Sequence, residues 1–295
     1  MDKILGTYNY GICLFSLEIL QDFLKKEKIR SKKLLDKFQK DKELYLATQK
    51  EGIWLPIVRI NSGNYVIKLE GYDKPFDDEW ELKLAYDGFN MEIKDSLCIS
   101  DTGAFYTFHA DDFSEYEHSY QSLDGETTYS AYKYDVPSGK YLVSIKGYAR
   151  KQSSENYDIP NYGFLFSLIK VEAFDGFKNP RESELYEFNI DWLTKSKEAV
   201  IYWFSEAEGG KAEPPAKEDY TSVIQLEEGK TCYLHIKFDR KDPAQDKMTD
   251  TGRVRILFND SLNHLLSSNA EYTIYEESRK RGKSIYQKVG RIVIK

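Results

Sequence analysis

The most constraining feature of this sequence is a phrase that occurs twice. Ser62–Tyr72 reads Ser-Gly-Asn-Tyr-Val-Ile-Lys-Leu-Glu-Gly-Tyr, and Ser138–Tyr148 reads Ser-Gly-Lys-Tyr-Leu-Val-Ser-Ile-Lys-Gly-Tyr. In each copy a glycine turn precedes a run in which alternate residues are apolar. Such a period of two predicts a strand with one buried face. We expect the alternate residues of both copies to face one core, namely Tyr65, Ile67, Leu69, Tyr141, Val143 and Ile145.

Short runs of this kind recur along most of the chain and are separated by turn signals such as Asp87-Gly88 and Pro137-Ser138-Gly139. No helical pattern lies between successive strands, so a βαβ fold is not expected. The sequence predicts a mainly β protein, α+β overall. It predicts an N-terminal helical hairpin followed by antiparallel β-sandwich or jelly-roll-like units. The sequence predicts three parts. Residues 1–51 form an N-terminal strand and helical hairpin that packs on the first β-unit. Residues 52–192 form one sandwich-like domain and residues 193–295 form a second.

The N-terminal region predicts one strand and then two helices. Residues 5–15 alternate as a single strand. Ser16 is a candidate cap for a helix with an apolar stripe, because its hydroxyl can accept a bond from a free N–H of the first turn. Ser31 is the corresponding candidate for a second helix, which carries Leu34, Leu35 and Phe38.

Composition restricts the partners and the compartment. The net charge of −7 argues against a nucleic-acid-binding face, which needs clustered lysine and arginine. The three cysteines are widely spaced, so neither a disulfide framework nor a cysteine zinc site is expected. No signal peptide and no membrane-length apolar run is present. We expect a soluble, cytoplasmic protein that binds no nucleic acid, membrane or cofactor.

The motifs that mark common enzyme classes are missing. The sequence contains no G-x-S-x-G, no phosphate-binding glycine loop and no H-E-x-x-H. Paired carboxylates could serve a glycosidase, but a chain with 49 acidic residues contains many such pairs, so their presence does not indicate an enzyme. We therefore expect a protein that is not an enzyme.

One acidic segment is a candidate for metal binding. It runs from His109 to His118, and its candidate ligands are His109, Asp111 and His118. Clustered carboxylates with imidazole suit a divalent ion. The residue order is not that of an EF-hand, and the competing interpretation is an exposed acidic loop. A metal-dependent enzyme or a calcium-binding β-domain is the corresponding alternative function.

A carbohydrate-binding module is a second alternative, because such modules stack sugar rings on exposed aromatic side chains. Trp54 and Trp203 lie within apolar runs and are expected in the core. Trp80 and Trp192 have more polar neighbours, which makes them the candidates for exposed sugar-stacking residues.

Protein binding is the leading hypothesis. Acidic surfaces attract basic partners, and tyrosine, of which the chain has 23, is enriched at binding hot spots. A 206–219 loop is also acidic. The candidate partner-binding residues are Asp77, Asp78, Glu79, Asp111, Asp112, Glu115 and Glu117.

Four phrases between residues 50 and 190 carry a resemblance to a group of known proteins. They are Ser119–Glu126, Pro137–Tyr141, Gly147–Lys151 and Phe174–Pro180. In these phrases the chain resembles uncharacterised bacterial β-rich proteins encoded near polymorphic-toxin and secretion-system loci. The resemblance implies an immunity protein that neutralises a cognate secreted toxin by occlusion, with a basic toxin domain as the partner. It implies no catalytic residues.

Overall fold

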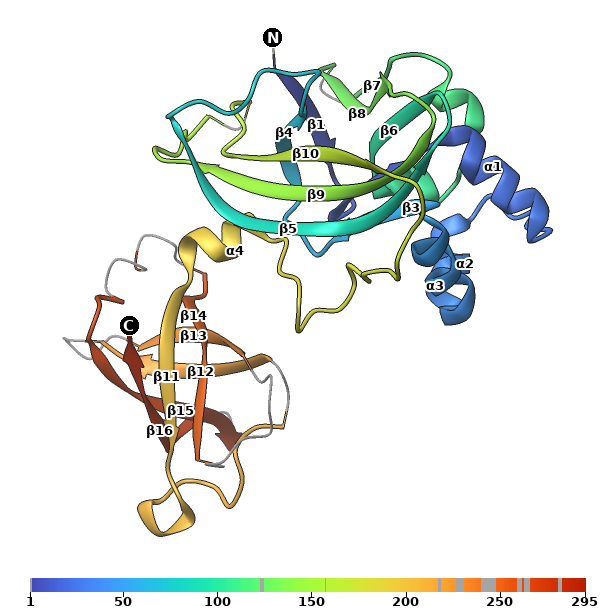
Figure 1. The fold of residues 1–295 in the computed structure, drawn as a ribbon. Coiled ribbons are helices and arrows are strands. Elements are labelled where there is room, and N and C mark those ends of the chain that lie inside the picture. Colours follow the sequence, from blue (N-terminus) through green and yellow to red (C-terminus); the bar gives the residue numbers. More distant parts are fainter. Residues whose placement is uncertain are drawn as a thin grey trace. The chain divides into compact units, whose positions relative to one another are not determined.

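The two copies of the repeated phrase lie in one sheet, on either side of the same strand (Figure 1). They form β4 (Gly63–Leu69) and β9 (Gly139–Arg150), and both pair with β10 (Tyr162–Val171), β4 in parallel and β9 antiparallel. Leu69 and Ile145 both lie opposite Phe166, so the alternate residues of the two copies share one face. All six predicted core residues are buried, which confirms the prediction.

The computed structural model describes residues 2–122, 125–156, 158–216, 219–226, 231–239, 248–258, 262, 266–280 and 283–295. Residues 123–124, within the segment that carries the resemblance, and residues 217–218 of the acidic 206–219 loop lie outside these ranges. The chain divides into two compact units, Met1–Asp191 and Trp192–Lys295. None of the helices in the described ranges has the length and apolar character needed to cross a membrane.

The first unit is built from two five-stranded sheets, with strand orders β1-β4-β10-β9-β5 and β3-β2-β6-β8-β7. The other strands are β1 (Lys3–Thr7), β2 (Gly11–Phe15), β3 (Trp54–Val58), β5 (Trp80–Ile93), β6 (Ser96–Asp101), β7 (Glu117–Gln121) and β8 (Thr127–Asp135). The sheets meet along β1 and β8, where the Tyr132 hydroxyl donates to the Ile4 carbonyl at 2.8 Å. This β-rich architecture agrees with the predicted mainly β class.

The single strand predicted over residues 5–15 is wrong, because the chain changes sheet within it. β1 pairs with β4 in one sheet, whereas β2 pairs with β3 and β6 in the other. The turn between them is held by Asp101, whose carboxylate accepts bonds from the Tyr8 N–H and from Asn9 Nδ2, both at 3.1 Å. The alternation of apolar residues continues across this turn and hides it in the sequence.

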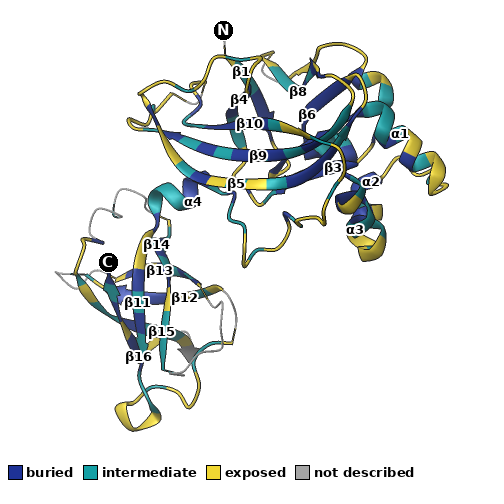
Figure 2. Cartoon of the chain, viewed as in Figure 1, coloured by how far each residue is buried: buried dark blue, intermediate teal, exposed yellow. Residues whose placement is uncertain are grey.

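Three helices, rather than the predicted hairpin of two, cover one face of the second sheet. They are α1 (Leu17–Lys26), α2 (Leu34–Lys40) and α3 (Lys42–Glu51), followed later by the short 3-10 helices η1 (Thr102–Phe105) and η2 (Ala110–Phe113). Leu20, Phe23 and Phe38 pack with Phe15, Trp54 and other sheet residues into one buried cluster. The outer surfaces of the three helices are exposed, most clearly at the end of α1 (Figure 2).

The predicted serine caps are only partly correct. Ser16 does precede α1, but its hydroxyl bonds to the backbone of Lys94 at 3.1 Å and caps no helical N–H. Ser31 accepts a bond from the Lys33 N–H, before the helix begins. The observed side-chain cap is at α3, where Asp41 accepts a bond from the Leu44 N–H at 3.0 Å.

The second unit is a closed six-stranded barrel with strand order β11-β14-β13-β12-β15-β16, so the predicted second sandwich is wrong. Two glycines allow neighbouring strands to approach closely. A Cβ at Gly252 would lie 2.4 Å from the Lys237 carbonyl oxygen, and one at Gly290 would lie 2.5 Å from that of Tyr202. The elements are α4 (Ile190–Lys195), which spans the unit boundary, β11 (Lys197–Trp203), η3 (Glu206–Glu208), β12 (Asp219–Gln225), β13 (Thr231–Phe238), β14 (Thr249–Ile256), β15 (Glu271–Lys280) and β16 (Lys283–Ile294).

Candidate functional site

The acidic segment 109–118 folds against the edge of the second sheet of the first unit. It forms η2 and then enters β7, the last strand of that sheet (Figure 1). Asp112 Oδ1 lies 3.9 Å from His118 Nε2, which holds η2 against β7. Asp111, Glu115 and Glu117 are exposed along this segment. We call residues 111–121, together with Tyr8, the acidic edge.

Three exposed tyrosines belong to the acidic edge. Tyr8, Tyr116 and Tyr120 are 51%, 58% and 44% exposed, which leaves their rings accessible for contact. Tyr120 lies opposite Thr128 in β8, and Thr128 and the Tyr8 ring both lie next to Gly6, which places the two tyrosines close together. The Tyr116 hydroxyl donates to Asp135 at 2.7 Å, which restricts the position of its ring.

The charge of the acidic edge is not neutralised by nearby lysine. The Lys133 ammonium donates to the carbonyls of Phe113, at 3.3 Å, and of Ser114, and it lies 5.4 Å from the centre of the Tyr116 ring. Within the described part of the chain, no ion pair joins Asp111, Glu115 or Glu117 to a basic side chain. The edge therefore presents negative charge to solvent.

A narrow hollow lies behind the acidic edge and is lined by Cys98, Phe113, His118 and Ala131 among others. Burial raises the pKa of the Cys98 thiol to about 12, although the Lys133 charge acts in the opposite direction. Because the thiolate is the reactive form, Cys98 is not a nucleophile near neutral pH. The cysteine acts here as a small buried packing group.

Ser130, His118 and Asp112 form a row beside this hollow. His118 Nδ1 lies 2.7 Å from Ser130 Oγ, and Ser130 occupies a bulge of β8 opposite β7. The 3.9 Å between His118 Nε2 and Asp112 exceeds hydrogen-bond length, and Ser130 lies on a strand rather than on a strained turn. The row therefore does not have the geometry of a Ser-His-Asp catalytic triad. Its effect is to position the acidic segment.

The candidate metal ligands are not brought together. His109 Nδ1 lies 3.1 Å from Lys32 Nζ, whereas His118 contacts Ser130 and Asp112. Among the residues that the structure describes, no group of three or more histidine, cysteine or acidic side chains could hold a metal ion. Asp111 lies on the exposed 3-10 helix η2, and the metal-binding prediction gains no support from this geometry.

The other predicted acidic cluster, Asp77, Asp78 and Glu79, precedes β5 and so belongs to the first sheet. All three residues are exposed, but two of them shape the local turn. Asp77 Oδ1 accepts a bond from the Glu79 N–H at 3.1 Å, and the Glu79 carboxylate pairs with Arg150 at 2.9 Å. Asp77 and Glu79 therefore already make contacts within the protein, which leaves them less available to a partner.

The expected exposure of Trp80 and Trp192 is wrong, since their side chains are only 8% and 7% exposed. Phe76 and Arg150 cover the Trp80 ring, at 4.7 Å and 4.6 Å between centres. The Trp192 ring packs on the His235 ring at 5.0 Å. Polar neighbours in the sequence misled the prediction because Arg150 and His235 come from distant segments. Trp54 and Trp203 are buried, as expected.

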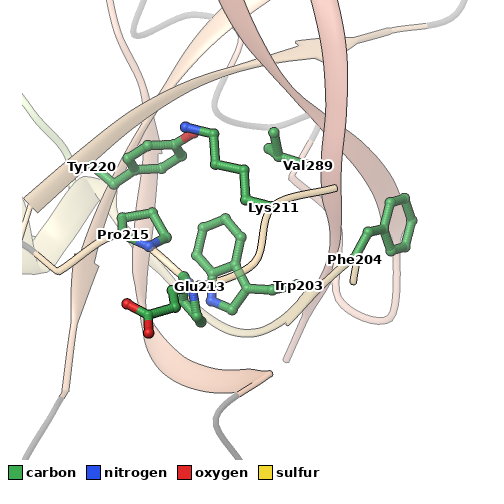
Figure 3. Close-up of a pocket in the computed structure, with 8 residues that line it drawn as sticks. Trp203, Phe204, Lys211, Glu213, Pro215, Tyr220 and Val289 are labelled. Carbon is green, nitrogen blue, oxygen red and sulfur yellow. The ribbon is translucent and has the colours of Figure 1, made fainter. Parts of the chain in front are cut away.

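The barrel has a separate aromatic hollow that the sequence did not reveal (Figure 3). It is shallow, with about 10 Å³ of free volume, the room of about one water molecule, and lies between Trp203, Tyr220 and the Pro214–Pro215 segment. The Trp203 and Tyr220 rings meet edge to face at 5.5 Å. Lys211 is held by Glu276 at 2.5 Å and extends past the Tyr220 ring (Figure 3). The hollow thus combines an apolar wall with a charged rim.

Part of the acidic 206–219 loop forms one wall of this hollow and is fixed at several points. Ser205 and Glu208 make a reciprocal capping box at η3. Gly209 adopts the left-handed conformation, with φ of 86°, and its carbonyl accepts a bond from Gln287 Nε2 at 3.1 Å. Most described residues of the loop are exposed, and it is tied to the barrel strands through the Gly209 carbonyl and Lys211.

Comparison with known proteins gives no match to a protein-family model, to a curated protein or to a solved structure.

Proposed function

We propose that this protein is a non-enzymatic protein-binding module and that the acidic edge binds a basic partner. The observation that carries the proposal is the set of exposed tyrosines on one sheet edge, beside acidic residues that make no ion pair with a basic side chain among the described residues. Tyrosine supplies contact area with little loss of side-chain freedom, so it suits binding hot spots. Unpaired surface acids accelerate encounter with a basic protein and favour it over acidic competitors.

The kind of partner that we propose is a secreted toxin with a basic domain. The acidic charge and the resemblance to proteins of toxin and secretion loci both support it. The protein would then act as an immunity protein in the cytoplasm, covering the toxin surface by steric occlusion. This mechanism requires a surface and no catalytic group.

The direct test is calorimetric titration of the full chain with the product of the neighbouring gene. Tyr120→Ala and Tyr116→Ala are each expected to weaken binding about tenfold, the usual effect of removing a hot-spot ring. Tyr286→Ala is the matched control, because Tyr286 is a 40% exposed tyrosine of the barrel. It is expected to leave the affinity unchanged.

Cellular protection provides a second measurement. Cells that express the neighbouring gene product should survive when the wild-type chain is present and lose that protection with Tyr116→Ala and Tyr120→Ala combined. Absence of a complex and of protection with the wild-type chain would refute the proposal. Equal losses with Tyr286→Ala would refute the location of the surface.

A further inference from the structure

We infer that the acidic edge captures its partner by strand addition, with an extended basic segment pairing along the open side of β7. This inference rests on the proposed protein-binding function and specifies how the same surface would work. Edge strands present unpaired N–H and C=O groups, and added strands are a common mode of peptide recognition. The two sheets of the first unit have four edge strands, β1, β3, β5 and β7, and they differ in how far they are protected.

Two of those edges are protected by burial. β3 contains Pro56, which cannot donate to an added strand, and four of its five residues are buried. β1 is covered by β8, with the Thr128 methyl group 2.6 Å from a Cβ placed at Gly6 and a hydrogen bond from Tyr132 to Ile4. Neither edge is available to a partner strand.

The third edge, β5, is interrupted and covered. Its pairing with β9 shifts register twice, between Leu82 and Leu84 and again between Tyr86 and Phe89. Such bulges twist an edge away from regular pairing. Lys178 binds Asp87 at 2.9 Å, and the Tyr86 hydroxyl bonds to the backbone of Glu187, so a later segment also lies over this edge.

β7 differs from these edges. Its pairing with β8 has one register shift, between His118 and Ser119, and the extra residue, Ser130, lies on β8 rather than on β7. Four of its five residues are exposed, and it contains neither proline nor lysine. Within the described ranges it pairs only with β8. In a strand paired on one side, alternate N–H and C=O groups point away from the sheet. His118 is the half-buried residue of β7, and its contact with Ser130 of β8 fixes the strand in position. The open side of β7 is therefore already extended before a partner strand binds.

Charge identifies the occupant as a basic strand rather than a second copy of this chain. Glu117 lies within β7, Glu115 lies two residues before it, and Asp111 lies in η2. Two copies of the chain each carry a net charge of −7 and the same acidic edge, so they repel each other. A strand that carries lysine or arginine on alternate positions would instead place positive charge opposite Glu117 and near Glu115. The same residues thus oppose self-association and favour a basic partner.

The test uses the full chain and a short acetylated peptide of alternating lysine and valine. Its matched control has the same side chains but alternate backbone nitrogens methylated, which removes the donors needed for pairing. Isotope-labelled protein is titrated with each peptide and followed by NMR. We expect the unmodified peptide to slow amide exchange in β7 and to bind about tenfold more tightly than its methylated form. Glu117→Gln should weaken its binding and reduce the salt dependence.

The outcomes separate strand addition from protein binding in general. Equal binding of both peptides would overturn strand addition while leaving a purely electrostatic acidic surface possible. Perturbation of residues outside β7, or no binding of either peptide, would also overturn it. The tyrosine variants measured with the neighbouring gene product decide the proposed function independently of these peptides.

Discussion

At the scale of single residues, the repeated phrase is a device for starting a strand. Gly63 and Gly139 have φ of 147° and 156°, a region that favours glycine. The tyrosine two positions later then bonds back to the carbonyl four residues before it. Tyr65 donates to Asn61 at 2.9 Å, and Tyr141 donates to Pro137 at 2.6 Å. The sequence predicted the strands, but this shared anchor depends on a turn geometry that alternation does not encode.

The anchor gives a first prediction. Tyr65→Phe and Tyr141→Phe keep the buried rings and remove only the hydroxyl bonds, so each is expected to lower the free energy of unfolding by about 1 kcal/mol. Tyr10→Phe serves as the control, because Tyr10 is 63% exposed and its change should stay within about 0.5 kcal/mol. Urea unfolding measures all three. A larger loss for Tyr10 than for Tyr65 would contradict the role of the anchor.

Asp73 gives a prediction that depends on pH. Burial acts to raise the pKa of this carboxyl, but bonds from the Leu69 N–H, Lys3 and Tyr134 outweigh it and lower the pKa below its ordinary 3.8. A lowered folded-state pKa contributes stability above the unfolded value and loses it as pH falls through the folded value. Asp73→Asn should therefore cost about 1–3 kcal/mol near neutral pH, and the difference should shrink below pH 3.8. Urea unfolding at both pH values checks this.

Asp158→Asn is the control for that measurement, because Asp158 is an exposed residue of a loop. It should change the unfolding free energy little at either pH. A difference between wild type and Asp73→Asn that grows as the solution is acidified would contradict the assigned hydrogen bonds.

At the scale of elements, α3 docks on the second sheet through a buried polar network. The Thr48 hydroxyl accepts bonds from Trp54 Nε1 at 2.9 Å and from Gln49 Nε2 at 3.0 Å, and it donates to the Tyr45 carbonyl at 2.6 Å. All four side chains are buried. The sequence predicted an apolar stripe for the helices and a core position for Trp54. It did not predict this network, because its partners are specified by how α3 approaches β3.

The network gives the element-scale prediction. Thr48→Val keeps the shape of the side chain but leaves the buried Trp54 and Gln49 donors without this acceptor, so it should cost about 2–3 kcal/mol. Thr48→Ser keeps the hydroxyl and removes one methyl group, which should cost about 1 kcal/mol. Chemical denaturation followed by tryptophan fluorescence is the measurement. Equal losses for the two variants would show that packing, not hydrogen bonding, fixes α3.

At the scale of the whole molecule, alternation predicts strands but not which strands pair. Tyr65 lies opposite Tyr162 in the parallel β4–β10 pair, across a long stretch of sequence. In the barrel, β11 pairs with β16, and Ala199 lies opposite Ile294. A half-buried strand has the same period in a sandwich and in a barrel, so the closure of the second unit could not be predicted. The acidic residues of the candidate surface were predictable from the sequence, whereas the edge position of β7 depends on the strand order β3-β2-β6-β8-β7 of the second sheet.

The two units should unfold as separate cooperative steps, because each encloses its own buried core. Ile145 in the first unit and Ile292 in the barrel are both 0% exposed. Replacing either by alanine leaves a cavity and should cost about 2–5 kcal/mol in its own unit. Differential scanning calorimetry should show Ile292→Ala lowering only the barrel transition and Ile145→Ala lowering only the other. If either substitution shifts both transitions equally, the chain unfolds as one cooperative block and the division at residue 192 has no energetic meaning.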